Sequence, residues 1–227
     1  MSRHANQESR KAREARLGEV DLYLVTSEEL SRGRNDLLIL GAGLEGGVRM
    51  VQLRDKRSSK RAFYEKALAA KKICERAGAL LIINDHLDVA LAVDADGVHL
   101  GTEDLPIAVA RALAPGLIIG ASSHSLDEAR AAEAAGASYV NIGPVYATAT
   151  KPDAPRFLGV EAITTISREL TVPFTVMGGI KAHHVDEVVA AGANILAVVT
   201  AVTAADDPGE ASRDLNRRIR HARSARR

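Results

Sequence analysis

Eight short apolar segments, separated by longer stretches with helical spacing, constrain the fold of this chain more than any other feature. They are rich in Val, Ile and Leu and are flanked by Gly, Asp or Ser, as expected of buried parallel strands. The predicted strands are Val20–Thr26, Val48–Leu53, Leu80–Asn84, Asp96–Leu100, Leu117–Ala121, Tyr139–Gly143, Pro173–Met177 and Ile195–Thr200.

The stretches between these strands carry signals of helix starts and stops. Helices are predicted over Arg61–Ala77, Ser125–Ala135 and Ala182–Ala191. Each is followed directly by a glycine, the residue favoured just past a helix C-terminus. Ser125 with Glu128 three residues later matches a capping box at a helix start.

The order helix, glycine, strand recurs in the phrases AGALLIIND, AGASYVNIG and AGANILAVV. Eight strands alternating with helices predict an α/β fold, a single (β/α)8 TIM barrel. A doubly wound open sheet is the alternative, but no G-x-G-x-x-G motif follows the first strand. In a barrel the functional residues gather at the C-terminal ends of the strands, so those ends are where chemistry is expected.

The length of 227 residues suits one such domain, predicted over residues 19–212 as the catalytic barrel. Residues 1–18, with five basic and two acidic side chains, are predicted to be a flexible basic N-terminal extension. Residues 213–227, with seven arginines and one aspartate, are predicted to be an Arg-rich C-terminal tail. Both ends are expected to be solvated. The alternative is that their charge contacts RNA or a membrane surface.

Composition excludes several classes of protein. Aromatic residues make up 3% of the chain and Trp is absent, so no base-stacking nucleic-acid surface is expected. No apolar run is long enough to span a membrane. The single cysteine, Cys74, cannot form an internal disulfide, which predicts a reducing compartment and a cytoplasmic location. Small-molecule substrates are the expected partners, and a homo-oligomer is left open.

The second predicted strand ends in a cationic sequence. Gln52 and Arg54 fall on the same side of the strand, with Lys56 two residues further on. An Arg and a Lys beside an amide donor can hold a phosphate or a diphosphate. The alternative is a solvated loop in which these cations pair with Asp55.

The next two strands end in carboxylates. Asn84 and Asp85 close the third strand, and Asp104 follows the fourth. Two carboxylates at neighbouring strand ends can share one Mg²⁺, which commonly binds one or two protein carboxylates and substrate phosphates. The alternative for each aspartate alone is a helix N-cap. Their proximity to Arg54 and Lys56 favours a Mg²⁺–diphosphate site.

The later strand ends carry hydroxyls and glycines. Ser122 can donate to a phosphate, and a long polar loop, 143–152, contains Thr148, Thr150 and Lys151. Gly179 lies in a Gly-Gly pair after the seventh strand, where the absence of side chains lets a phosphate approach the backbone closely. The loops after strands 7 and 8 of this fold often bind phosphate. Two phosphate sites predict two phosphorylated substrates, one of which loses pyrophosphate as its leaving group. No general base is evident, and loss of a charge-stabilised leaving group needs none.

Over residues of about 20–205 the chain resembles the thiamine-phosphate synthase family. The motifs that carry the resemblance are QLRDK (52–56), IIND (82–85), ADGVHLGTED (95–104), GASSH (120–124), GPVYATATK (143–151) and MGGI (177–180). Their ordered combination is highly specific.

The resemblance implies a transferase of thiamine biosynthesis with a (β/α)8 fold. It would join 4-amino-2-methyl-5-(diphosphooxymethyl)pyrimidine to 4-methyl-5-(2-phosphooxyethyl)thiazole, giving thiamine monophosphate and pyrophosphate. The implied mechanism is dissociative: Mg-bound pyrophosphate leaves, and the thiazole nitrogen captures the pyrimidine-methyl cation. One Mg²⁺ per subunit is the implied cofactor.

The resemblance also assigns residues to this reaction. The pyrimidine diphosphate would contact Gln52, Leu53, Arg54, Asp55, Lys56, Asn84, Ser122 and Lys151. Of these, Arg54, Lys56, Ser122 and Lys151 would be catalytic. The thiazole phosphate would contact Thr148, Ala149, Thr150, Gly179, Val199 and Thr200, and Mg²⁺ would bind Asp85 and Asp104.

Two positions depart from the family pattern. Thr200 stands where the family usually has Ser, and Ala147 replaces a common Pro. A related thiazole tautomerase family has a catalytic His where this chain has Pro144, which favours the synthase. The alternatives that remain are a tautomerase-like isomerase and a non-catalytic regulator that binds thiamine precursors.

Overall fold

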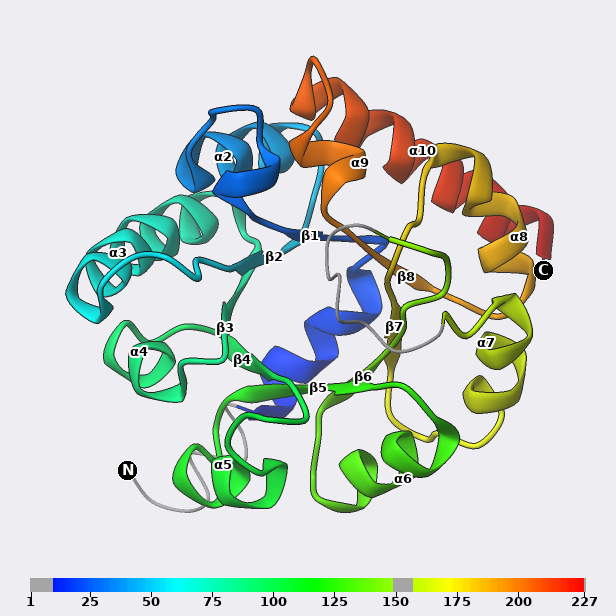
Figure 1. Cartoon of the computed structure of the whole chain (residues 1–227), viewed down its shortest axis with the longest axis horizontal. Helices are drawn as coiled ribbons and strands as arrows, with labels where there is room; N and C mark the ends of the chain where they lie inside the picture. Colours follow the sequence, from blue (N-terminus) through cyan, green and yellow to red (C-terminus); the bar gives the residue numbers. More distant parts are fainter. Residues whose placement is uncertain (1–9, 149–156, 227) are drawn as a thin grey trace.

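The computed structural model describes residues 10–148 and 157–226, in which eight parallel strands close into a barrel (Figure 1). Each strand pairs with the next along the chain, and the last pairs with the first. The strands are β1 (Leu22–Val25), β2 (Met50–Leu53), β3 (Leu80–Asn84), β4 (Gly97–Leu100), β5 (Ile118–Ser123), β6 (Tyr139–Ile142), β7 (Phe174–Val176) and β8 (Ile195–Val198). The predicted (β/α)8 barrel is confirmed.

Helices surround the barrel as an outer ring (Figure 1). The α-helices are α2 (Asp36–Glu45), α3 (Lys60–Ala77), α4 (Leu87–Ala92), α5 (Ile107–Leu113), α6 (Leu126–Ala134), α7 (Val160–Ser167), α8 (Val185–Ala190), α9 (Thr200–Thr203) and α10 (Pro208–Arg226). Short 3₁₀ helices are η1 (Arg16–Glu19), η2 (Glu28–Leu30) and η3 (Ala182–His184). Within the described ranges, no helix combines the length and the apolar character that crossing a bilayer requires.

The predicted helix ends are largely confirmed. Gly78 caps α3 in the left-handed conformation, with a φ of 62°, which glycine adopts without steric cost. At the start of α6 the Ser125 hydroxyl accepts the N–H of Glu128 at 3.1 Å. In a regular capping box the Glu128 carboxylate would accept the N–H of Ser125. Here it accepts the N–H of His124, one residue earlier.

The barrel interior is apolar at one end and polar at the other. Tyr23, Met50, Ile82 and Ile118 belong to an inner cluster that also contains Leu17, whose side chain is 1% exposed. The polar inward side chains sit toward the C-terminal ends of the strands: Gln52, Asn84, His99, Ser122 and Asn141. The C-terminal end is therefore the end equipped for chemistry.

The N-terminal segment differs from the prediction of a flexible extension. Residues 10–15 are helical and continue into η1, which crosses the barrel in Figure 1. Arg13 donates to the carbonyl of Gly116 at 3.0 Å, and Arg16 pairs with Asp96 at 3.1 Å. With Leu17 packed in the inner cluster, the segment closes the N-terminal end of the barrel. The prediction is wrong for residues 10–18, and residues 1–9 lie outside the described ranges.

The predicted Arg-rich tail is also wrong, because residues 213–226 lie within α10. This helix packs against α8 and α2 and buries Leu215 and Ile219. Arg220 and Arg223 both pair with Asp21, which precedes β1. The arginines therefore hold the last helix of the ring against the barrel while their heads stay near water.

Candidate active site

A cavity of about 380 Å³ lies at the C-terminal ends of the strands. Most of the predicted site residues that the structure describes line it: Gln52, Arg54, Lys56, Asn84, Asp85, Asp104, Ser122, Thr148, Gly179, Val199 and Thr200. Closure of the barrel thus brings together residues that lie far apart in the sequence, such as Gln52 and Thr200. We call the rim after β2, β3 and β4 the β2–β4 half, and the rim after β6, β7 and β8 the β6–β8 half.

Several predicted residues are not in this lining. Leu53 is fully buried in the layer between strands and helices. Asp55 turns away from the cavity and accepts hydrogen bonds from Lys66 and Ser58. Ala149, Thr150 and Lys151 fall outside the described residues.

The β2–β4 half is built from charged side chains. Arg54 and Lys56 follow β2, and the ammonium of Lys56 pairs with the carboxylate of Asp85. Burial alone would raise the pKa of Asp85, but the Lys56 ammonium and a hydrogen bond with Asp104 together lower that pKa below its usual range. Burial and the neighbouring Asp85 raise the pKa of Asp104, so the two carboxylates lie close enough to affect one another.

Neither aspartate acts as the helix cap that was the alternative reading. His86 stands at the N-cap of α4 and Pro106 at that of α5, and neither helix has a side-chain cap. Asp104 instead accepts the N–H of Gly101 at 2.7 Å, and Asp85 adopts a left-handed backbone with a φ of 61°. For a non-glycine residue this conformation is uncommon and carries a small steric cost, as is typical of functional sites.

The floor of the cavity is a chain of hydrogen bonds across the barrel. Gln52 Nε2 donates to the Tyr23 hydroxyl at 2.6 Å, which lies 2.9 Å from the Tyr139 hydroxyl. The Tyr139 hydroxyl is 3.0 Å from His99 Nδ1, and His99 Nε2 is 3.0 Å from Ser122 Oγ. Burial raises the pKa of both tyrosines, so their hydroxyls stay protonated. Gln52 on β2 and Ser122 on β5 are therefore held by one buried network.

Sequence reasoning missed His99 in this network. Its position in β4 places it on the inward side with Gly97, and Gly97 and Gly120 are the small residues that leave room inside the barrel. A Cβ on Gly120 would lie 2.1 Å from Tyr139 Cζ, so only glycine fits beside this ring. The available signal was a histidine in the middle of an otherwise apolar strand.

The β6–β8 half is shaped by backbone rather than by charge. Gly178 and Gly179 have φ values of 104° and 67°. A Cβ on Gly178 would lie 2.5 Å from Pro144 Cα, and one on Gly179 would lie 2.7 Å from the Ala147 carbonyl oxygen. The glycine pair is therefore needed for the β7 and β6 loops to meet at the cavity rim, besides any role toward a ligand.

Lys181 was also missed by sequence reasoning, although it follows the Gly-Gly-Ile segment directly. Its ammonium donates to the Thr200 hydroxyl at 2.7 Å. Among the described residues it has no carboxylate within ion-pair distance. The β6–β8 half thus holds a cation whose charge no described side chain neutralises.

Comparison with known proteins identifies the family of the chain. A family model described as thiamine monophosphate synthase matches residues 22–202. The chain is 45% identical over 194 residues to the thiamine-phosphate synthase of Chloroflexus aurantiacus, covering 86% of this chain and 90% of that protein. It is 45% identical over 195 residues to the thiamine-phosphate synthase of Shouchella clausii, covering 86% and 93% of the two chains.

Solved structures agree with these sequence matches. A thiamine phosphate pyrophosphorylase from Pyrococcus furiosus superposes with a TM-score of 0.84 at 36% identity, covering 90% of this chain and 98% of that one. A 3-hexulose-6-phosphate synthase superposes with a TM-score of 0.65 at 19% identity, which shows a shared fold alone. On the strength of the family match and of relatives covering most of its length, the chain is an enzyme of the thiamine monophosphate synthase family.

Proposed function

We propose that the cavity joins 4-amino-2-methyl-5-(diphosphooxymethyl)pyrimidine to 4-methyl-5-(2-phosphooxyethyl)thiazole. Family membership supports formation of thiamine monophosphate by group transfer. The single observation that supports the placement of both substrates is that most of the described residues of the two predicted phosphate-binding sets line one cavity, with Arg54 and Lys56 in the β2–β4 half and Gly179 and Thr200 in the β6–β8 half.

The β2–β4 half would bind the pyrimidine diphosphate. Arg54 can grip phosphate oxygens with two parallel hydrogen bonds, and Lys56 adds a second positive charge. Gln52, Asn84 and Ser122 lie deeper in the same cavity and offer amide and hydroxyl groups to the pyrimidine end. The buried network behind Gln52 and Ser122 orients both side chains before substrate arrives.

Asp85 and Asp104 fit the role of ligands to one Mg²⁺ per subunit. They are neighbouring carboxylates on the cavity rim, and hard oxygen ligands suit this ion. Among the described residues no group of three or more His, Cys, Asp or Glu side chains is arranged to hold a metal ion, so diphosphate oxygens and water would complete the coordination. When bound there, Mg²⁺ supplies positive charge that stabilises the departing diphosphate.

The β6–β8 half would bind the thiazole phosphate through Thr148, Gly179, Val199 and Thr200. The hydroxyls of Thr148 and Thr200 can donate to phosphate oxygens. Thr200 keeps the hydroxyl of the serine that is usual in the family, so its role is retained. Ala149, Thr150 and Lys151, which the resemblance adds to this set or to the diphosphate set, stay predictions from the sequence.

The reaction is balanced without a general base. The bond between the pyrimidine methylene carbon and the diphosphate oxygen breaks, and its electron pair leaves with pyrophosphate. The lone pair of the thiazole nitrogen then forms the new carbon–nitrogen bond, and no proton is removed. Arg54 and Lys56 stabilise the charge that develops on the leaving group, while the cavity walls keep water from the methyl cation.

We also propose a cytoplasmic location for this reaction. Cys74 is the single cysteine of the chain, and its side chain is buried. Burial raises the pKa of its thiol to about 12, so it stays protonated and unreactive. A chain without a disulfide suits a reducing compartment.

Isotope scrambling tests the dissociative step. Pyrimidine diphosphate carrying ¹⁸O in the bridge between carbon and phosphorus is incubated with protein and Mg²⁺, without the thiazole phosphate. Reversible ionisation moves the label into non-bridging positions of recovered substrate. A label that stays in the bridge, in protein that turns over rapidly once thiazole phosphate is added, would contradict reversible ionisation before the thiazole phosphate binds.

A further inference from the structure

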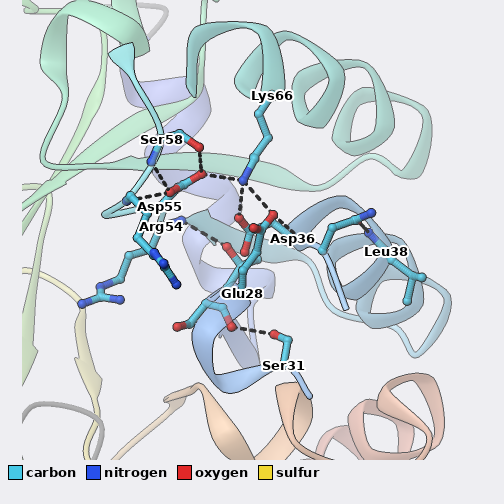
Figure 2. Close-up of polar contacts among 12 residues, drawn as sticks. Glu28, Ser31, Asp36, Leu38, Arg54, Asp55, Ser58 and Lys66 are labelled. Carbon is cyan, nitrogen blue, oxygen red and sulfur yellow. Dashed lines mark hydrogen bonds and ion pairs between the residues drawn. The ribbon is translucent and has the colours of Figure 1, made fainter. Parts of the chain in front are cut away.

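A single lysine beside the cavity is bonded to three carboxylates (Figure 2). Lys66 Nζ lies 2.8 Å from Glu28 Oε1 and 2.9 Å from Asp36 Oδ2, and it also pairs with Asp55. The side chains of Asp36 and Asp55 are 0% and 6% exposed, and that of Lys66 is 17% exposed. These three ions are therefore largely removed from water, whereas the side chain of Glu28 is 45% exposed.

The four residues come from three parts of the fold. Glu28 and Asp36 belong to the connection after β1 and the start of α2, Asp55 follows β2, and Lys66 lies on α3. A further bond joins the two connections, because the Thr26 hydroxyl accepts the N–H of Arg54 at 3.1 Å. Lys66 thus fastens the β1–α2 and β2–α3 connections to each other at the cavity rim.

Asp55 connects the Lys66 cluster to the two cations that line the cavity. It stands between Arg54 and Lys56, and its carboxylate also accepts the Ser58 hydroxyl at 2.6 Å and the N–H of Arg57 at 2.9 Å. With Asp55 turned outward onto Lys66, its two neighbours line the cavity. The outward side of the loop is fixed by ions and its inward side is left for a ligand.

Such a cluster is not explained by stability. Three carboxylates share one ammonium, and Asp36 Oδ1 is buried with no hydrogen-bond partner among the described residues. Burying ions costs free energy that pairing only partly offsets, and an apolar core of similar volume is often as stable or more so. What the ions add is a defined geometry, which an apolar contact does not impose.

We propose that Lys66 is a positioning residue that holds Arg54 and Lys56 in the geometry that binds the diphosphate. This inference rests on the proposed placement of the pyrimidine diphosphate in the β2–β4 half. Lys66 does not touch substrate. It acts through Asp55, and its effect is confined to the substrate that the β2–β4 half binds.

The test compares Lys66→Met with Lys71→Met in the full-length protein. Lys71 is a matched control: it lies on the same helix, its side chain is 15% exposed, and it pairs with Glu75. We expect Lys66→Met to raise the KM for pyrimidine diphosphate and the Kd for Mg²⁺-pyrophosphate by about 10- to 100-fold, the scale of a displaced binding group. The KM for thiazole phosphate stays within about twofold, and Lys71→Met changes neither substrate's KM.

Conservative variants separate positioning from folding. Lys66→Arg keeps the positive charge and should retain most of the wild-type affinity for pyrophosphate. Asp55→Asn weakens the contact with Lys66 and should lower the pyrophosphate affinity as Lys66→Met does. If Lys66→Met does not fold, these two variants carry the test. Folded Lys66→Met or Asp55→Asn with unchanged KM for pyrimidine diphosphate and unchanged pyrophosphate affinity overturns the inference.

Arg54→Ala, measured in parallel, distinguishes this failure from failure of the proposed site. If Arg54→Ala weakens pyrophosphate binding and the Lys66 and Asp55 variants do not, the site stands and the positioning role is wrong. If Arg54→Ala leaves pyrophosphate binding unchanged, the proposed placement of the diphosphate is wrong and the inference fails with it.

Discussion

The two halves of the cavity rim hold their polar groups by different means. In the β2–β4 half, charged side chains form ion pairs: Lys56 pairs with Asp85, and Asp55, next to Arg54 in the chain, pairs with Lys66. In the β6–β8 half, the rim is formed by close backbone contacts at Gly178 and Gly179. Ligand binding in the β2–β4 half should therefore depend on charge, and ligand binding in the β6–β8 half on the shape of the backbone.

This difference follows from the two proposed ligands. The diphosphate gains negative charge as it leaves during the reaction. Cations that are already held in place stabilise that developing charge in the transition state. A phosphate that only anchors the thiazole undergoes no change, so backbone and hydroxyl donors suffice. Substitutions in the two halves should consequently affect different substrates and different kinetic constants.

Removal of Mg²⁺ should have the largest effect, because Asp85 and Asp104 form a carboxylate pair in the β2–β4 half of the described rim. We expect EDTA to slow thiamine monophosphate formation by about 10³-fold, equivalent to roughly 4 kcal/mol of transition-state stabilisation. Excess Mg²⁺ should restore the rate. The measurement is initial velocity at saturating concentrations of both substrates, and an unchanged rate in EDTA would contradict the proposed site.

Arg54→Ala should have the next largest effect. Loss of a bidentate cation from the leaving group should lower kcat/KM for pyrimidine diphosphate by about 10²- to 10³-fold. The KM for thiazole phosphate should hardly change. Arg57→Ala is the control, since its side chain is 78% exposed and it lies outside the cavity lining. Equal losses in the two variants would mean that Arg54 has no special role.

Gly179→Ala should break the β6–β8 half by shape alone. Its φ of 67° and the Ala147 carbonyl oxygen, 2.7 Å from the added Cβ, both oppose a side chain. We expect the KM for thiazole phosphate to rise by about 10- to 100-fold as the loops move apart. Gly41→Ala, where nothing lies within 4 Å of the new Cβ, should leave both KM values unchanged. A Gly179→Ala enzyme with wild-type kinetics would show that the loop contact is dispensable.

Lys181→Met should have the smallest effect and sharpens the contrast between the halves. Its partly exposed ammonium, bonded to Thr200, should favour the thiazole phosphate by about 1 kcal/mol, or fivefold in KM. The dephosphorylated thiazole alcohol should bind the variant and the wild type alike. An effect on pyrimidine diphosphate instead would place the two substrates the other way round.

The fold was predictable because its signals are local. The strands are short and mainly apolar, and Gly78 marks a helix end by its left-handed conformation. Polar residues obscure such runs, so β5 continues to Ser123, two residues beyond the predicted end. Helix α10 was missed because its sequence is rich in arginine and has few apolar residues, and the burial of Leu215 and Ile219 depends on neighbours that only the closed barrel supplies.

The site was predictable where function demands particular residue types at strand ends. Arg54, Asp85 and Asp104 could be found in this way. Lys66 could not, because its three partners lie 38, 30 and 11 residues away in the chain. The outward turn of Asp55 was unpredictable for the same reason, since its partner is placed by the packing of α3.

A crystal structure with Mg²⁺, pyrophosphate and thiamine monophosphate bound tests the division of the rim most directly. We predict pyrophosphate on Arg54 and Lys56, with Mg²⁺ between it and the carboxylates of Asp85 and Asp104. The phosphate of thiamine monophosphate should lie on the opposite half, against Gly179 and Thr200. Pyrophosphate bound to the β6–β8 half, or Mg²⁺ bound away from both aspartates, would contradict the account.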